Sequence, residues 1–207
     1  MNEHSFIFES STMRTRDEAK EVAIREKAIE MIVKEGFDGF SMQKLAKAAN
    51  VSPATIYLYF KNREDLLNQL YITIDEVFSD STLRGFDPEM TFEEGLWLQW
   101  KNRFDHHVNY PNHILFMEQF RSSPLVDHKD IKITKFKAAM EQFFNNAVKR
   151  KELTELPLEI FWAIAYGPLY TLIKFHMAKK SLAGRKFSLT EAKMRDAFNL
   201  VVKALKK

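Results

Sequence analysis

Side chains able to contact a polyanion gather between Phe40 and Leu67, in the segment FSMQKLAKAANVSPATIYLYFKNREDLL. The whole chain has a formal net charge of only +3, but the stretch 39–63 contains four Lys or Arg residues and no Asp or Glu. Because carboxylates repel phosphates, a stretch without acidic side chains is where DNA could approach. The same segment carries hydroxyl, amide and small side chains, which are suited to contacts with phosphates and base edges.

Apolar spacing predicts that two short helices carry these side chains. Ser41 suits the N-cap of the first helix, whose buried face would include Leu45. Ser52 and Pro53 suit the N-cap and the first position of the second helix, which is expected to end near Phe60.

Longer helices are expected on either side of this pair. Ile24 and Ala28 recur at helical spacing in a helix over 17–35, which Gly36 would end in the left-handed conformation. A fourth helix is expected over about 62–80. Two short helices joined by a tight turn and supported by a preceding helix form a helix-turn-helix, whose second helix can enter the DNA major groove.

The candidate DNA contacts are the side chains that this arrangement turns outward. On the second short helix they are Ser52, Pro53, Ala54, Thr55, Tyr57 and Tyr59. Gln43 is the outward residue nearest the start of the first, and Lys61 and Arg63 follow at the start of the next helix. Spacing alone is equally compatible with an ordinary helical core, but the missing acidic residues and the two tyrosines favour DNA binding.

From Gly36 to Leu67 the chain resembles the DNA-binding domain of the TetR family of bacterial transcriptional regulators. The matching positions are Ala46, Val51, Ser52, Ile56, Tyr57, Tyr59, Phe60, Arg63, Leu66 and Leu67. Asn50 departs from the family's usual Gly, and Leu58 departs from its frequent aromatic residue; both are acceptable variants.

Carried over residue by residue, the resemblance implies two kinds of DNA contact. Phosphates would be bound by Ser41, Tyr57, Tyr59, Lys61 and Arg63, and base edges by Gln43, Thr55 and the tip 52–54. Lys44, a basic residue of the acid-free stretch, completes the predicted DNA-binding set. Residues 13–20 would be either an arm that touches DNA or a solvated charged tail. The implied partners are palindromic or near-palindromic operator DNA and a second copy of the chain.

Helical spacing also dominates the rest of the chain, so the predicted fold class is all-α with about nine helices. The later helices are expected over 91–109, 111–122, 131–151, 157–180 and 188–206. Gly167-Pro168 would either kink the helix over 157–180 or separate two helices. The predicted domains are a flexible N-terminal arm (1–15), a helix-turn-helix domain (16–62), a connecting helix (63–80) and a helical ligand-binding and dimerisation domain (81–207).

In residues 81–207 the resemblance implies an effector pocket and a dimer interface formed by the last two helices. Any single aromatic residue here is more often part of the core, but their density suggests a pocket for a bulky apolar or aromatic molecule. The pocket candidates are Trp97, Trp100, Phe104, Phe116, Phe120, Phe136, Phe143, Trp162, Tyr166 and Tyr170. The helix over 157–180 is apolar on more than one face, so a second chain is expected to cover part of it. The candidate dimer residues are Phe161, Leu169, Leu172, Ile173, Phe198, Leu200 and Val201.

Composition argues against several other classes. The chain has no Cys, which excludes disulfides, cysteine zinc sites and cysteine nucleophiles. Without a long apolar run or a secretory signal, no membrane association is expected, and the cytoplasm is the expected location. His106, His107 and His113 lack the partners of a metal site, and no catalytic or cofactor-binding motif is visible, so no metal, cofactor or enzymatic activity is expected.

The sequence therefore predicts a dimeric, sequence-specific DNA-binding regulator, a repressor released from operator DNA by a small apolar or aromatic effector. Two other classes stay open. One is a helical ligand-binding or catalytic protein whose helix-turn-helix no longer contacts DNA, and the other is a helical scaffold that only dimerises. The intact surface over 52–63 favours the first interpretation.

Overall fold

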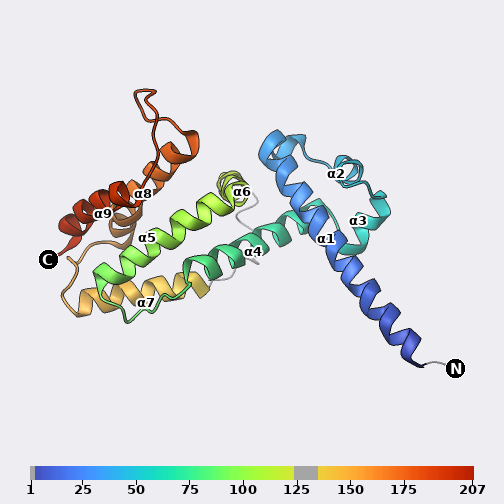
Figure 1. The fold of residues 1–207 in the computed structure, drawn as a ribbon, viewed down its shortest axis with the longest axis horizontal. Helices are drawn as coiled ribbons and strands as arrows, with labels where there is room; N and C mark the ends of the chain where they lie inside the picture. Colours follow the sequence, from blue (N-terminus) through green and yellow to red (C-terminus); the bar gives the residue numbers. More distant parts are fainter. Residues whose placement is uncertain (1–2, 124–134) are drawn as a thin grey trace. The chain divides into compact units, whose positions relative to one another are not determined.

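The computed structural model describes residues 3–123 and 135–207, with side chains from Glu18 onward. These residues fold into nine α-helices, so the chain is all-α as predicted (Figure 1). The helices are α1 (Glu3–Gly39), α2 (Met42–Ala48), α3 (Pro53–Tyr59), α4 (Arg63–Thr82), α5 (Phe92–Asn109), α6 (Pro111–Arg121), α7 (Lys135–Lys149), α8 (Leu158–Ala178) and α9 (Glu191–Leu205). No helix in the described part of the chain is long and apolar enough to cross a membrane.

Hydroxyl side chains start four of these helices. Ser41, Ser52, Thr91 and Thr190 each accept a hydrogen bond from the backbone N–H three residues later, at the starts of α2, α3, α5 and α9. Each cap satisfies an N–H group that has no partner within its own helix. Helix α9 begins later than the sequence predicts, because Thr190 rather than Ser188 caps it.

Helix α1 is longer than the sequence predicts. Its backbone is helical from Glu3, whereas the sequence predicts a flexible arm over 1–15 and a helix only from Asp17. No Gly or Pro precedes Gly36, so no helix-breaking residue interrupts this stretch. At Gly36 the backbone leaves the helical conformation with φ 72° and ψ 176°, which is the break that the sequence predicts at this glycine.

The chain divides into two compact units, and the division falls within α4, between Ile74 and Asp75. The first unit contains α1, α2, α3, the start of α4, and α6 from Asn112. Its core draws on all five of these helices and includes Ile24, Ala28, Ile32, Leu45, Ile56, Phe60, Leu66, Leu70, Phe116 and Phe120. The two short helices α2 and α3 are therefore fixed by a core that extends well beyond them.

Phe116 and Phe120 of α6 are expected in the effector pocket, but the structure places them in the core of the first unit. The ring of Phe37 lies edge-on to both, with centroid distances of 6.1 Å to Phe116 and 6.2 Å to Phe120. Tyr71 of α4 stacks on Phe120 at 4.5 Å. Spacing identifies the apolar face of a helix such as α6, but it does not identify the helices that cover that face.

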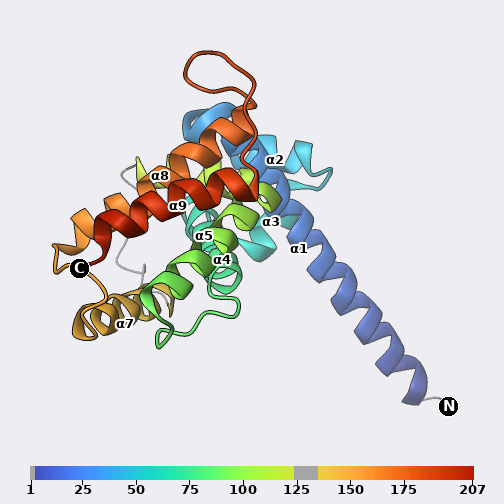
Figure 2. The same ribbon diagram turned by 60° about the vertical axis from the view of Figure 1, so that its left-hand side comes forward.

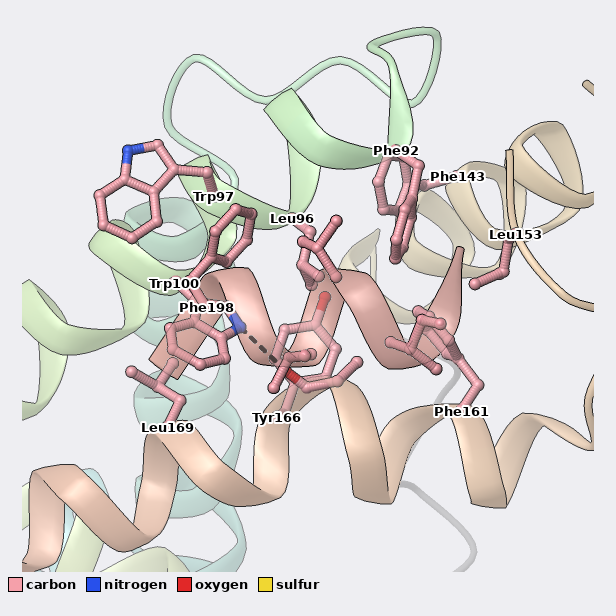
Figure 3. Close-up of a cluster of buried hydrophobic side chains, with 14 of the residues drawn as sticks. Phe92, Leu96, Trp97, Trp100, Phe143, Leu153, Phe161, Tyr166, Leu169 and Phe198 are labelled. Atoms are coloured by element: carbon pink, nitrogen blue, oxygen red, sulfur yellow. Dashed lines mark hydrogen bonds between the residues drawn. The ribbon is translucent and has the colours of Figure 1, made fainter. Parts of the chain in front are cut away.

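The second unit contains the end of α4 together with α5, α7, α8 and α9. Helices α8 and α9 lie side by side in both views (Figures 1 and 2), and α5 packs against α8. Figure 3 shows their shared core, which includes Phe92, Leu96, Trp100, Phe161, Tyr166, Leu169 and Phe198. The Trp100 indole N–H donates to the Ala165 carbonyl over 2.8 Å, so this buried polar group has a partner.

Helix α8 continues through Gly167-Pro168 and is not divided into two helices there. Pro168 lacks an N–H group, so it cannot donate to the carbonyl of Ile164 one turn earlier. The Thr171 hydroxyl donates to the Gly167 carbonyl over 3.0 Å in the same part of the helix.

Candidate nucleic-acid interface

Helices α2 and α3 are joined by a tight turn over residues 49–52. Asn50 adopts φ 54° there, a left-handed conformation that Asn tolerates better than most residues. The Val51 N–H closes the turn by donating to the Ala46 carbonyl over 3.0 Å. Leu45 before the turn and Ile56 after it are both fully buried in the same core. This is a helix-turn-helix in which both helices are fixed by backbone and core contacts.

The exposed face of α3 differs from the predicted one. Tyr57 is 53% exposed and Leu58 is 81% exposed, and Ala54 lies one turn earlier on the same face. Thr55 and Tyr59, both predicted contacts, are only half-buried rather than fully outward. Leu58 was not among the predicted contacts, which followed the tyrosines of the family pattern, although the helical spacing 54, 57, 58 contains the signal.

Lys61 is exposed beyond the end of α3, and its backbone is fixed by a chain of hydrogen bonds. The Lys61 N–H donates to Asp65 Oδ2 (2.8 Å), and the Asp65 N–H donates to Asn62 Oδ1 (2.8 Å). Gln69 Nε2 also donates to Asp65 Oδ2 (3.0 Å), while Gln69 Oε1 accepts from Arg25 Nη2 of α1 (2.7 Å). The loop between α3 and α4 is thereby tied to α1, and the Lys61 ammonium extends from a fixed backbone.

Two other predicted DNA contacts bind the protein's own backbone. Arg63 is half-buried, and its Nη2 donates to the Phe37 carbonyl over 2.7 Å. Lys44 Nζ donates to the Gly39 carbonyl (2.8 Å) and lies 3.4 Å from a carboxylate oxygen of Glu35. An exposed ion pair contributes little, so Lys44 can turn toward DNA at small cost. Arg63 instead connects the start of α4 to the end of α1.

The remaining predicted contacts lie at the starts of α2 and α3. Ser41 and Ser52 use one lone pair of their hydroxyls as N-caps, and Thr55 Oγ1 lies 2.9 Å from Ser52 Oγ. A capping hydroxyl still has a proton to donate to a phosphate. Gln43 and Pro53 are exposed. The predicted contacts therefore lie at the starts of α2 and α3, along α3, and in the loop that leads into α4, with Leu58 added and Arg63 engaged internally.

Comparisons with known proteins agree with this geometry. The family described as "Bacterial regulatory proteins, tetR family" matches residues 24–70, from the middle of α1 into α4. A transcriptional regulator of the helix-turn-helix type from Haemophilus influenzae is 33% identical over 135 residues, which cover 65% of this chain and 71% of that relative. The chain belongs to the TetR family.

Solved structures of TetR-family regulators have a similar fold along almost the whole chain. One from Marinobacter aquaeolei has a TM-score of 0.74 at 25% identity and covers 94% of this chain and 99% of its own. One from Haemophilus influenzae has a TM-score of 0.74 at 28% identity and covers 91% of this chain and 97% of its own. As a TetR-family member, the protein is a DNA-binding transcriptional regulator and not an enzyme. The family binds operator DNA, typically as homodimers.

The other predicted pocket residues of this TetR-family protein all lie in the second unit. Trp97, Trp100 and Phe143 are part of its buried core. Phe104 lies edge-on to His176 of α8, with 5.2 Å between the ring centroids. The last four predicted residues surround a single buried guanidinium, that of Arg103, and they are Phe136, Trp162, Tyr166 and Tyr170.

Arg103 is fully buried and was not among the predicted site residues. The signal for it was present in the sequence, because Phe92, Leu96, Trp100 and Arg103 follow one another at helical spacing on α5. Arg103 therefore interrupts an otherwise apolar stripe. A fully buried arginine is rare unless it has a partner, so this position calls for a physical explanation.

Most of the predicted dimer residues pack inside one chain. Five are buried in the core of the second unit and so present no surface to a partner: Phe161, Leu169, Ile173, Phe198 and Val201. Leu172 is half-buried, and Leu200 of α9 is 70% exposed. The apolar stripes of α8 and α9 are thus used first to pack the two helices against each other and against α5.

The three histidines differ in their hydrogen-bond contacts and in their pKa shifts. His106 Nδ1 lies 2.6 Å from the Ser81 hydroxyl, and His107 Nδ1 lies 2.7 Å from the Arg103 carbonyl. Burial lowers the pKa of His107, and burial also lowers the pKa of His113 against the opposing charge of Glu26. Among the described residues, no group of three or more His, Asp or Glu side chains could hold a metal ion.

Proposed function

We propose that this TetR-family protein is a repressor that binds palindromic operator DNA as a homodimer and leaves it when a small effector binds in the second unit. The observation that carries the proposal is the exposure of Gln43, Ala54, Tyr57 and Lys61 around a rigid helix-turn-helix. With α3 in the major groove, the residues at its start would contact base edges. Tyr57 and Lys61 would bind phosphates and position the helix.

A homodimer would supply the two α3 helices that a palindromic operator needs. Half-sites of such operators lie about one helical turn of DNA apart, so two copies must hold their recognition helices at a fixed separation. Exposed apolar side chains on the adjacent helices α8 and α9 support this part of the proposal. They are Leu158, Ile160, Met177 and Leu200.

Helix α4 provides a physical route from effector to DNA. Leu66 and Leu70 at its start lie in the core of the first unit, and Phe78 near its end lies beside Arg103 in the second. Arg63 ties the first turn of the same helix to the Phe37 carbonyl. An effector that displaced Phe78 would therefore act on the helix that begins at Arg63, directly after the loop that carries Lys61. By thermodynamic reciprocity, such an effector must bind less tightly to the DNA complex than to the free protein.

The test is to recover and sequence the genomic DNA fragments that the purified full-length protein retains. We expect enriched fragments that share an inverted repeat. An Ala54→Glu variant should retain none of them, because it places a carboxylate at the exposed start of α3 without touching the core. Ala138→Glu, at an exposed position of α7, is the matched control and should retain the same fragments as the unchanged protein. The absence of any common sequence, or retention by Ala54→Glu, would overturn the proposal.

A further inference from the structure

The described part of the second unit contains a buried arginine without an anionic partner. Arg103 of α5 is fully buried. Its Nη1 donates to the Tyr170 hydroxyl, but Nε and Nη2 have no hydrogen-bond partner among the described residues, carboxylates included. Because a guanidinium stays protonated in proteins, this site holds a full positive charge away from water.

Aromatic rings compensate for only part of this burial. The distances from the guanidinium carbon to the ring centroids are 4.1 Å for Tyr166, 4.9 Å for Phe136, 5.1 Å for Trp162, 5.6 Å for Phe78 and 5.9 Å for Tyr170. Cation–π attraction stabilises the charge, but ring faces do not replace the hydrogen-bond acceptors that water would offer to two N–H groups. Burying this charge therefore lowers the free energy of unfolding unless a further hydrogen-bond acceptor is present.

The two unsatisfied nitrogens define the shape of the missing acceptor. Nε and Nη2 lie on one edge of the planar guanidinium, and their N–H bonds on that edge point in the same direction. This edge matches the two oxygens of a carboxylate, which can accept both hydrogen bonds at once. Nη1 is already engaged with Tyr170, so the open edge offers its two parallel N–H donors to one acidic group with two acceptor oxygens.

We propose that the effector of this regulator is an amphipathic carboxylate. Its carboxylate would accept from Nε and Nη2 of Arg103, and its apolar body would lie among the rings around that residue. This inference rests on the proposed function and deepens it, since an apolar or aromatic effector now also carries a negative charge at one end.

Neighbouring groups fit such a ligand. The Tyr166 hydroxyl is a further buried polar group with no hydrogen-bond partner among the described residues. Burial raises the pKa of Tyr166 to about 12 against the opposing charge of Arg103, so its hydroxyl stays protonated and can donate. Phe78 and Trp162 are only half-buried, so rings of the cage itself reach the protein surface and offer a path of entry.

The test compares carboxylates with their matched alcohols in direct titrations of the full chain without DNA. The probes are benzoate, 3-phenylpropionate and decanoate, each paired with the primary alcohol of the same carbon skeleton. We expect at least one carboxylate to bind the unchanged protein about ten- to a hundredfold more tightly than its alcohol, the range expected for hydrogen bonds to a charged group. Arg103→Met should remove this difference and leave the alcohol's affinity unchanged.

Two further variants keep the test decisive. Arg195→Met is the matched control. Arg195 also lies over an aromatic ring, that of Trp97 at 3.4 Å, but it is only half-buried. This variant should retain the full preference for the carboxylate. Arg103→Lys keeps the charge but loses the paired N–H edge, so it should weaken carboxylate binding even if Arg103→Met folds poorly. The proposal is overturned if no carboxylate is preferred over its alcohol, or if Arg103→Met and Arg103→Lys retain the preference.

These outcomes separate the inference from the proposed function. The titrations involve no DNA, so a preference for carboxylates that depends on Arg103 would stand even if no operator were found. Conversely, operator binding with no preference for carboxylates would overturn the inference and leave the repressor proposal intact.

Discussion

Replacing Lys61 with alanine should weaken binding to operator and non-specific DNA alike, since its exposed ammonium is proposed to bind a phosphate. Each phosphate neutralised on B-DNA contributes about −0.9 to the slope of log K against log salt concentration. A homodimer presents two Lys61 side chains, so the slope should become less negative by about 1.8. Folding stability should not change, because alanine retains the backbone N–H that donates to Asp65.

Arg63→Ala is the matched comparison, since the two residues are near neighbours but have different contacts. The half-buried Arg63 guanidinium donates to the Phe37 carbonyl over 2.7 Å. A hydrogen bond from a charged group, discounted for partial exposure, contributes about 1–2 kcal/mol. At about 2–4 °C per kcal/mol for a chain of this size, the Tm should fall by about 2–8 °C. The salt slope should change less than in Lys61→Ala.

Both variants can be measured with the same two assays. Fluorescence anisotropy with an operator duplex and a scrambled duplex gives the slope between about 50 and 200 mM salt. Thermal unfolding of the free protein gives the Tm. An unchanged slope in Lys61→Ala would refute its phosphate contact. An Arg63→Ala variant that keeps its Tm and flattens the slope instead would show that the assignments of the two residues are reversed.

Three further predictions test the scaffold. Gly36→Ala should destabilise the fold by about 1–3 kcal/mol, because φ 72° with ψ 176° is open almost only to Gly. A denaturant titration measures this change, and an unchanged free energy of unfolding would contradict the strain assigned to Gly36. Leu200→Glu should give monomers with poor operator affinity in sedimentation and anisotropy measurements, whereas a variant that remains dimeric would exclude this residue from the interface. Burial lowers the pKa of His107 below 6.5, so the unfolded chain binds the proton more readily and stability should fall as pH drops below 6.5. His107→Gln should flatten this decline in Tm, and an equal decline in both proteins would contradict the assignment.

The helix-turn-helix could be predicted from the sequence because its defining residues act locally. Ser41 and Ser52 cap the helices on which they stand, and each accepts from an N–H only three residues away. Gly36 and Asn50 mark turns through their own backbone conformations. Such effects depend on residue type and a few neighbours, so they are visible without any knowledge of tertiary packing.

The roles of single side chains were harder to predict, because they depend on partners far away in the sequence. Arg63 was expected on a phosphate, but its acceptor is the Phe37 carbonyl, 26 residues earlier. Phe116 and Phe120 were expected around an effector, but their neighbours Phe37 and Tyr71 come from α1 and α4. Aromatic content indicates that a core exists, whereas the choice of core requires the path of the chain.

Arg103 combines a local sequence signal with partners far away in the sequence. Comparison with Arg25 shows which local signal distinguishes the two arginines. Arg25 also lies over an aromatic ring, that of Phe60 at 5.0 Å, but both Nε and Nη2 donate to Glu21 four residues earlier, over 2.9 and 2.7 Å. The residue four positions before Arg103 is Gln99, which carries no charge. The edge formed by Nε and Nη2 is therefore satisfied within α1 for Arg25, whereas the same edge of Arg103 is left open within α5. An arginine on an apolar helical stripe with no acidic residue one turn away can thus be recognised from sequence as a candidate anion site.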